Sequence, residues 1–381
     1  MDQLESLCGT GHTNWPVGAI NYKRIITKVN NNQITLDAPI VDPIDKNYNS
    51  ATLAKYTWTH KIEECGVENI RLESAFKSNV DEDHGWVAIK FKNIENAWVK
   101  NVNAYYFGFG CVSALSGSYK ISIENSGMFD YKSIVTGGRR YGFYSDGCDL
   151  ILFKNCISDK GRHDFVQGSK TPGPNVYTYC SATNSTNDSG PHHRWATGTL
   201  WDNITTNNAL NVQNRQCSGS GHGWSGAQQV FWNSTAAKEI IIQDPPGSPI
   251  NWAVGCTATI TNNGDFVEEP LGIVQSTNNP ITAIPSLYEA QLKSRLSTLN
   301  LKNIKVKNNI NIVLYPNPSK NLLYIKNVNE GAKIKIYNTL GQLVKEKNFI
   351  NSLDISSLKI GLYILVILND REEYYLEFSK E

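Results

Sequence analysis

Short apolar segments separated by polar turns recur along most of the chain. Their starts lie roughly 20–30 residues apart, they are rich in Val, Ile and aromatic side chains, and Gly, Asn, Ser and Pro fill the intervals. Runs of this kind predict strands, so we expect an all-β protein with hardly any helix. The predicted strands are Val67–Leu72, Ala97–Val102, Tyr119–Ile123, Leu150–Cys156, Val176–Cys180, Leu200–Ile204, Val230–Asn233 and Trp252–Cys256. A period in this range is typical of a solenoid.

The strand composition favours parallel pairing. Within Leu150–Cys156 apolar and polar residues alternate only at the end, so both faces of this strand would be covered, as parallel strands often are. A parallel β-helix repeats at this period and needs no hairpins, whereas an antiparallel β-sandwich with irregular loops is the alternative. Asparagines stand at predicted strand ends or turns, namely Asn69, Asn101, Asn125, Asn155 and Asn203. They would form ladders in a β-helix, or they are ordinary turn residues.

The pattern changes at both ends of this region. Tyr22–Ala38 predicts a pair of strands, and the Leu-rich stretch from Ser286 to Leu299 predicts a short amphipathic helix that would close the solenoid. We therefore expect three parts: a β-helix domain over residues 1–300, a Lys- and Asn-rich linker over 301–311, and a compact β unit over 312–381.

Charge and cysteine usage exclude several classes of protein. The 36 Lys and Arg nearly cancel the 35 Asp and Glu, so net charge gives no argument for nucleic-acid binding, and no apolar run approaches the length of a membrane span. None of the eight cysteines forms a CxxC pair, which argues against a zinc knuckle. Cys156 and Cys180 are about one coil apart, and we expect buried thiols there rather than a disulfide. We also expect a monomer.

The C-terminal unit resembles the type A sorting domain of the type IX secretion system in Bacteroidetes. The matching residues are Leu314-Tyr315-Pro316-Asn317-Pro318, Ile334-Lys335-Ile336-Tyr337-Asn338, Leu340-Gly341-Gln342-Leu343-Val344, Leu353-Asp354-Ile355 and Gly361-Leu362-Tyr363. The resemblance implies a small β-sandwich, engagement by the secretion machinery, and attachment at the cell surface or release. The first residues lack a basic start and an apolar core. Since export requires a signal peptide, we expect the native chain to begin upstream.

Four clusters of basic and imidazole side chains mark the candidate chemistry. They are Arg139-Arg140-Tyr141, Arg162-His163-Asp164, His192-His193-Arg194, and Arg215 with His222, and they hold four of the seven histidines. Arg139 to His163, His163 to His192 and His192 to His222 are 24, 29 and 30 residues apart. One cluster per coil would stack them together, and such a surface suits an anionic substrate.

Residues 66–296 resemble the pectate-lyase-like superfamily of right-handed parallel β-helix proteins that act on carbohydrate. Blocks that look like those of an uncharacterised bacterial branch are Thr136–Tyr141, Gly161–Phe165, Ser189–Gly198 and Ala209–Arg215. The clusters do not match the calcium-binding Asp set and catalytic Arg of the pectate lyases. The resemblance implies a site in a groove along the helix face.

Elimination from a uronate explains what the clusters could do. A cation must neutralise the carboxylate, a base removes the C5 proton, and an acid protonates the oxygen that leaves C4. Guanidinium groups bind oxyanions in bidentate fashion, and imidazole titrates near working pH. Arg139, Arg140, Arg162, Arg194, Arg215, His222 and Trp195 are the predicted substrate-binding residues, and His192, His193, His163 and Tyr141 the predicted catalytic ones.

Within this set His192 or His193 is the first choice of base and His163 the second. Neighbouring residues of a strand point to opposite sides, so we expect only one of His192 and His193 to face the groove. For all of these positions the alternative is a structural role, with satisfied histidines, solvated arginines and core tryptophans. The tryptophans in question are Trp195, Trp201, Trp224 and Trp232.

Two carboxylate arrangements in the sequence allow other chemistry. Asp81-Glu82-Asp83-His84 could bind calcium, although an exposed acidic turn is the favoured interpretation, and otherwise no cofactor is expected. Glycoside hydrolysis would need two opposed carboxylates, for which Asp146, Asp149, Asp164, Asp188 and Asp202 are available.

The sequence thus predicts a secreted carbon–oxygen lyase that acts on uronate-bearing polysaccharide or oligosaccharide, sulfated or not, of algal (ulvan-type) or plant origin. It would be either a polysaccharide lyase or an oligosaccharide dehydratase. A hydrolase, or a non-catalytic carbohydrate-binding surface protein, is the alternative.

Overall fold

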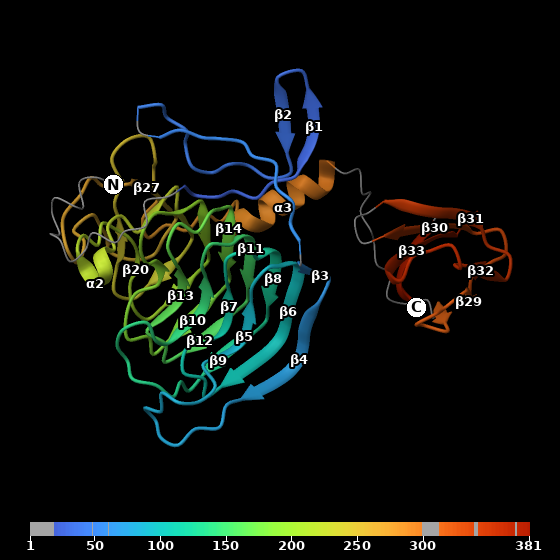
Figure 1. The fold of residues 1–381 in the computed structure, drawn as a ribbon, viewed down its shortest axis with the longest axis horizontal. Helices are drawn as coiled ribbons and strands as arrows, with labels where there is room; N and C mark the ends of the chain where they lie inside the picture. The colour runs from blue at the N-terminus through green and yellow to red at the C-terminus, as the bar shows by residue number, and fades with distance from the viewer. Residues whose placement is uncertain (1–18, 48, 60, 299–311, 339–341, 370–371) are drawn as a thin grey trace. The chain divides into compact units, whose positions relative to one another are not determined.

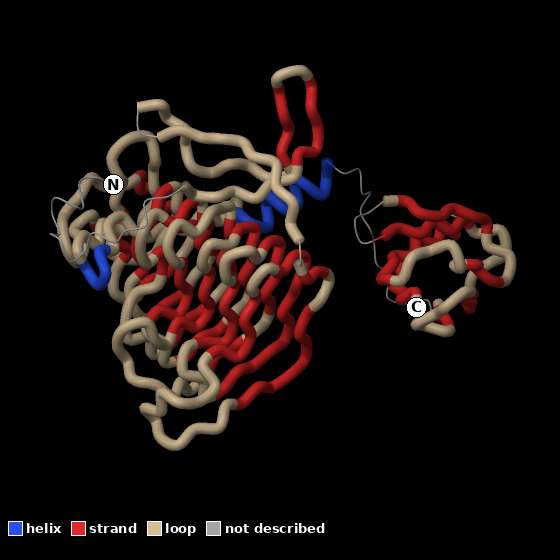
Figure 2. Tube along the Cα trace, in the orientation of Figure 1, coloured by secondary structure: helices blue, strands red, loops and turns tan. Residues whose placement is uncertain are grey.

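The computed structural model describes residues 19–47, 49–59, 61–298, 312–338, 342–369 and 372–381. The chain divides into two compact units, Met1–Leu292 and Lys293–Glu381. Strands dominate both, as Figure 2 shows. Among the described residues, none of the helices has the length and apolar character needed to cross a membrane.

The first unit is a parallel β-helix built from three rows of strands (Figure 1). Row one contains β3 (Ile62–Glu63), β4 (Gly66–Glu73), β6 (Ile94–Tyr105), β8 (Tyr119–Glu124), β11 (Asp149–Lys154), β14 (Asn175–Thr178), β18 (Thr199–Asp202), β22 (Val230–Trp232), β25 (Trp252–Val254) and β27 (Ile273–Gln275). All eight predicted strands fall on this row. The predicted all-β, right-handed parallel β-helix is therefore confirmed, and the sandwich alternative is wrong for this unit.

Two further rows complete each coil. Row two continues from the second half of β6 through β9 (Gly127–Phe129), β12 (Ile157–Asp159), β15 (Ser181–Thr183), β19 (Thr205–Thr206) and β23 (Thr235–Ala236). Row three contains β5 (Val87–Phe91), β7 (Gly110–Ala114), β10 (Tyr141–Ser145), β13 (His163–Gln167) and β16 (Gly190–Pro191), with β20 (Leu210–Val212), β24 (Ile240–Ile242) and β26 (Ile260–Thr261) in later coils. A short pair, β17 (Ala196–Thr197) and β21 (Gly226–Ala227), lies beside it. In each coil, loops therefore connect the strand of row three to the neighbouring rows.

Stacked side chains fill the interior of the coils. Phe153, Tyr177, Trp201 and Phe231 are register partners on successive strands of row one, with ring centroids 4.4, 4.6 and 5.9 Å apart. Trp201 is fully buried in this stack, so its core alternative is correct. Cys156 and Cys180 are buried free thiols, as predicted.

The turn between rows one and two carries the predicted asparagine ladder. All five predicted asparagines have φ between 50° and 55°, a left-handed conformation that Asn tolerates better than most residues. Asn101 Nδ2 donates to Asn69 Oδ1 (2.8 Å), and Asn155 Nδ2 donates to Asn125 Oδ1 (3.0 Å). Tyr179 takes the equivalent turn of the next coil (φ 52°) and interrupts the ladder.

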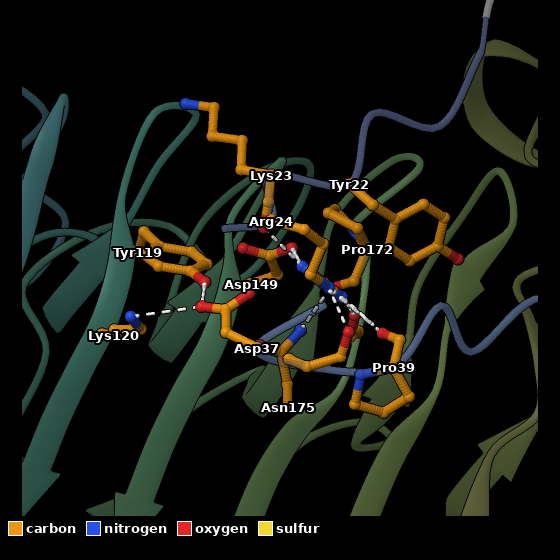
Figure 3. Close-up of polar contacts among 12 residues, drawn as sticks. Tyr22, Lys23, Arg24, Asp37, Pro39, Tyr119, Lys120, Asp149, Pro172 and Asn175 are labelled. Atoms are coloured by element: carbon orange, nitrogen blue, oxygen red, sulfur yellow. Dashed lines mark hydrogen bonds and ion pairs between the residues drawn. The ribbon is translucent and has the colours of Figure 1, made fainter. Parts of the chain in front are cut away.

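The N-terminal segment lies across row one (Figures 1 and 3). It contains the predicted strand pair, β1 (Ile26–Asn30) and β2 (Gln33–Leu36). The guanidinium of Arg24 contacts Asp149 Oδ2 (Nη1, 2.5 Å) and donates to the carbonyls of Gly173 and Pro39 (Nη2, 2.7 Å each). The Tyr119 hydroxyl also donates to Asp37 Oδ2 (2.6 Å). These contacts fix the segment to β8 and β11, and its described residues, 19–47 and 49–59, are called the arm below.

The predicted C-terminal helix forms at the residues expected for it, but its start is bound to row one. It is α3 (Leu287–Thr298), and a short helical turn, α2 (Ser218–Gly221), occurs earlier. Asp202 of β18 accepts hydrogen bonds from Ser286 Oγ (2.5 Å) and the Tyr288 N–H (3.0 Å), and Glu289 pairs with Lys154 of β11 (2.5 Å). Asp202 holds the start of the helix against row one. The prediction that it closes the last coil is therefore wrong.

The C-terminal unit is a small antiparallel β-sandwich, as predicted. One sheet contains β28 (Val313–Tyr315), β29 (Leu322–Lys326) and β32 (Ser352–Asp354), and the other β30 (Lys333–Asn338), β31 (Leu343–Asn348), β33 (Gly361–Asn369) and β34 (Glu372–Lys380). Leu323, Ile336 and Leu365 meet in its buried core. The predicted linker, 301–311, lies outside the described residues.

Candidate functional site

Tyr141 and His163 begin neighbouring strands of row three. They are register partners in the parallel pair β10 and β13, and their rings meet edge to face with centroids 5.1 Å apart. His163 is 1% exposed and Tyr141 is 8% exposed. The repeat spacing thus places two predicted catalytic residues in contact on successive coils.

His192 stands at the centre of the cluster. Its backbone N–H donates to the Gln167 carbonyl (3.0 Å). Its ring centroid lies 4.4 Å from that of His163, 4.9 Å from that of His222 and 5.5 Å from that of His193. The four imidazoles and Tyr141 form what we call the histidine cluster.

His192 and His193 both join the cluster, because the rings of His193 and His222 are also in contact (5.2 Å). The expectation that the two side chains point to opposite sides is therefore wrong. Its premise fails because β16 ends at Pro191 and the chain turns at Arg194 and Trp195, whose φ values are +59° and +62°. Strand alternation does not apply in such a turn.

Hydrogen bonds define the tautomer of one imidazole. His163 Nδ1 lies 2.7 Å from the Asp188 carbonyl oxygen, which only accepts, so Nδ1 carries the proton and Nε2 keeps its lone pair. The Tyr141 hydroxyl lies 3.3 Å from His192 Nε2. The buried atoms without a hydrogen-bond partner among the described residues include His163 Nε2 and Nδ1 of His192, His193 and His222. Each of these nitrogens therefore has an unused donor or acceptor.

Arg215 and Asp188 form a buried ion pair beside the histidines. Arg215 Nη2 contacts Asp188 Oδ2 and donates to Asn211 Oδ1 (3.2 Å), while its Nε has no partner in the described structure. Burial favours a raised pKa for Asp188, but Arg215 and His163 outweigh it and lower the pKa below its usual range. Asp188 is therefore an anion that orients Arg215, and His163 Nδ1 lies 3.6 Å from its Oδ1.

Burial keeps the imidazoles neutral. It lowers the pKa of His163 to about 4, of His193 to about 3 and of His222 to about 4. Nearby positive charges lower these pKa values further, while Asp188 partly opposes the shift at His163. The pKa of His192 is lowered for the same reasons. Burial raises the pKa of Tyr141, which keeps its proton. At neutral pH the histidines are proton acceptors and Tyr141 is a proton donor.

The predicted arginines separate into two groups. Arg162 and Arg215 act electrostatically on Tyr141, and Arg162 also donates to the Gly137 carbonyl. Arg194 is directed to Ser220, with Nη2 2.7 Å from its Oγ, and its charge reaches His193 and His222.

Arg139 and Arg140 occupy a separate loop. Arg139 forms an ion pair with Glu82 (2.6 Å), and Arg140 donates to the Ser133 carbonyl. These partners correspond to the structural alternative, but Arg140 Nε is a buried donor without a partner in the described structure. The predicted role of Arg139 and Arg140 in substrate binding therefore stays a prediction.

Trp195 and the acidic turn have structural partners as well. Trp195 Nε1 donates to Asp42 Oδ2 of the arm (3.3 Å). In the acidic turn, Asp81 accepts from the backbone N–H groups of Lys77 (2.7 Å) and Asp83 (2.9 Å), while Glu82 is paired with Arg139. These partners agree with the favoured interpretation, an acidic turn, and the calcium alternative stays a prediction.

Sequence reasoning overlooked the role of Asp188, which it considered only as a hydrolase carboxylate, and it did not include Asn211. Asp188 lies one coil after His163, with the two positions 25 residues apart. The coil spacing that related the clusters would also have found it. Asn211 lies four residues before Arg215 and carries no such signal.

Three residues of the site could hold a metal ion. One donor atom each from His163, Asp188 and His192 lies within 4.8 Å of the others, and all three residues are buried. Neutral imidazoles with one carboxylate suit zinc-like ions rather than calcium, which prefers oxygen ligands. Asp188 would have to share its carboxylate between the ion and Arg215.

Two of the comparisons with known proteins concern the chain as a whole. No curated protein matches the chain. A solved structure that matches is the tailspike protein gp49 from Acinetobacter baumannii bacteriophage Fri1, a capsular polysaccharide depolymerase, with 10% identity, a TM-score of 0.26, and coverage of 82% of this chain. The chain spans 60% of the length of that tailspike chain.

The C-terminal unit has a family match of its own. Residues 313–378 match the model described as a secretion system C-terminal sorting domain. The predicted sorting domain is therefore confirmed, and the protein carries a type IX secretion signal that directs it to the cell surface or releases it from a Bacteroidetes-type bacterium.

Proposed function

We propose that the β-helix is a carbon–oxygen lyase that acts on uronate-containing polysaccharide or oligosaccharide by β-elimination. The observation that carries the proposal is the contact of the Tyr141 hydroxyl with His192 Nε2 at 3.3 Å, next to Arg162 and Arg215. Elimination needs a base, an acid and a cation for the carboxylate, and these side chains provide all three.

His192 and Tyr141 are the proposed base and acid. His192 Nε2 removes the C5 proton, the electron pair of that C–H bond forms the C4=C5 double bond, and the C4–O bond breaks. The Tyr141 hydroxyl donates its proton to the departing oxygen. Transfer of the acquired proton from His192 Nε2 to the Tyr141 oxygen, across their contact, restores both groups.

The arginines would bind the carboxylate. Arg162 and Arg215 bring two positive charges against the single negative charge of Asp188, which leaves one positive charge uncompensated while the imidazoles are neutral. Arg215 Nε is a buried donor without a partner in the described structure. An anionic sugar would therefore gain a charge-assisted hydrogen bond. His163, His193 and His222 would complete the wall of the site.

The leaving oxygen can be glycosidic or a free hydroxyl at the chain end. The first gives chain cleavage, a polysaccharide lyase, and the second gives loss of water, an oligosaccharide dehydratase. Both yield a 4,5-unsaturated uronyl product. Sulfated algal glycans of the ulvan type are the first substrates to test, because sulfate esters add negative charge.

The experiment is incubation of the purified full chain with uronate-containing oligosaccharides, followed by ultraviolet absorbance and mass spectrometry. A conjugated product supports elimination, and its mass separates cleavage from dehydration. New reducing ends without absorbance would mean hydrolysis, and binding without either would mean a carbohydrate-binding protein. The His192→Ala variant should lose the absorbance signal, and unchanged activity would contradict the assignment of the base.

The hydrolase alternative finds little support in the placement of the aspartates. Asp149 is paired with Arg24, Asp164 accepts from Ser158, and Asp188 is paired with Arg215. Asp202 binds the start of α3. Burial raises the pKa of Asp146, but no opposed carboxylate accompanies it among the interactions of the described residues.

A further inference from the structure

A row of aromatic side chains leads into the histidine cluster from earlier coils. Trp86, Phe109, Tyr141 and His163 follow one another along row three, with successive ring centroids 6.5, 5.2 and 5.1 Å apart. Tyr144 flanks the row, its ring 5.6 Å from Phe109. Because coils repeat at about 4.8 Å, the row advances by one ring per coil.

The backbone is shaped to hold this row. The Phe109 N–H donates to the Trp86 carbonyl (2.7 Å), and the Gly108 N–H donates to the Gly85 carbonyl (3.1 Å), so the two turns stack in register. A Cβ atom on Gly108 would lie 2.4 Å from the Trp86 ring. Glycine at this position therefore lets the indole lie against the backbone of the next coil.

The outer rings of the row stay partly accessible. Trp86, Phe109 and Tyr144 are half-buried, whereas Tyr141 and His163 are buried. The aromatic row thus runs from partly open rings to the proposed catalytic pair. Core aromatic residues such as Trp201, by contrast, are fully buried in the interior stack.

We propose that Trp86 and Phe109 form a stacking platform for sugar residues of the same glycan chain that the histidine cluster binds. Aromatic faces suit the apolar C–H face of a pyranose, while the ring edges leave its hydroxyls in water. We infer the same glycan chain as the ligand because the platform is continuous with the histidine cluster: Phe109 contacts Tyr141, and the platform extends the site by two coils. This inference rests on the proposed function for the site, and it adds that chain length determines affinity.

The test is calorimetric titration of the full chain with uronate-containing oligosaccharides of two, four and six sugars, in the His192→Ala background so that no turnover occurs. We expect affinity to rise with length. Trp86→Ala should weaken hexasaccharide binding by about tenfold, equivalent to 1.4 kcal/mol, with little change for the disaccharide. Trp86→Tyr should retain most of the hexasaccharide affinity, and Tyr179→Ala, a change at an exposed aromatic residue on the ladder turn, should leave it unchanged.

Equal affinity for all lengths, or no effect of Trp86→Ala, would overturn the platform. So would an equal loss for every length in Trp86→Ala, because that marks general damage to the fold, or an absence of oligosaccharide binding. Failure of the proposed function gives a different result. If binding depends on length but the unsubstituted chain forms no unsaturated product, the platform proposal stands and the lyase proposal fails.

Discussion

Removing Arg24 should release the arm from the β-helix, and the structure sets the size of the effect. Arg24 and Asp149 are an ion pair with 4% and 2% of their side chains exposed. Truncation of Arg24 to Ala leaves a buried carboxylate without its cation, a change that costs about 3–5 kcal/mol. The detached arm would then become roughly two to four orders of magnitude more populated.

Protonation of Asp149 makes this effect depend on pH. Burial raises the pKa of Asp149 to about 6, and Arg24 opposes the shift. The folded carboxyl therefore binds its proton more readily than the unfolded one, and its contribution to stability declines as pH rises from about 4 to 6. Without Arg24 the carboxylate must be buried unpaired at neutral pH. The Arg24→Ala penalty should thus be large at pH 7 and smaller at pH 4.

Hydrogen exchange of the arm measures the detached population directly. Amides of β1 and β2 should exchange faster in Arg24→Ala, while those of β11 and β14 stay protected. The double variant with Asp149→Asn should recover part of the loss, because it removes the unpaired charge. Unchanged exchange in Arg24→Ala, or a double variant no better than the single one at pH 7, would refute the reasoning.

Further predictions concern the site and the fold. His192→Gln and Tyr141→Phe should each lower kcat by at least about 10²-fold if they are base and acid, as measured by product absorbance, and a smaller loss would argue against that pairing. Folding lowers the pKa of His163 from 6.5 to about 4, so its contribution to stability is complete above pH 6.5 and is lost as pH falls toward 4; urea titrations of His163→Gln should show a weaker pH dependence. Asn125→Ala should destabilise by about 1–2 kcal/mol, since φ is 50° there, and Asn125→Gly by less. Trp201→Ala should cost about 3–5 kcal/mol in the same assay, and a cost below 1 kcal/mol would contradict its place in the interior stack.

Row one could be predicted because its chemistry is repetitive. Phe153, Tyr177 and Trp201 recur in one register on successive coils, and turn residues such as Asn125 follow the strands. Apolar periodicity and turn chemistry therefore agree, which is what makes a strand recognisable. Row three was not predicted as a row, because its strands alternate with polar loops of unequal length. Tyr141, which belongs to row three, was identified only because it follows Arg139 and Arg140 in the sequence.

Which residues of the site lie close together was easier to predict than where their side chains point. Coil spacing brought His163, His192 and His222 together correctly, since successive coils stack. It could not show that Arg139 would pair with Glu82, because an exposed arginine pairs with a nearby carboxylate, and Glu82 belongs to the loop between β4 and β5. The turn after β16 likewise removed the alternation on which the choice between His192 and His193 rested.

The arm also has a consequence for the order in which the protein folds. Arg24 reaches Asp149 across 125 residues and the Gly173 carbonyl across 149, so its binding surface exists only after β11 and the following coil have formed. Contacts of such separation form late, since the intervening chain must be ordered first. A segment that is synthesised before the coils must wait for them before it can dock. Docking of the arm would therefore be the last step of folding. If the chain is exported unfolded, the arm would dock only after the coils have formed outside.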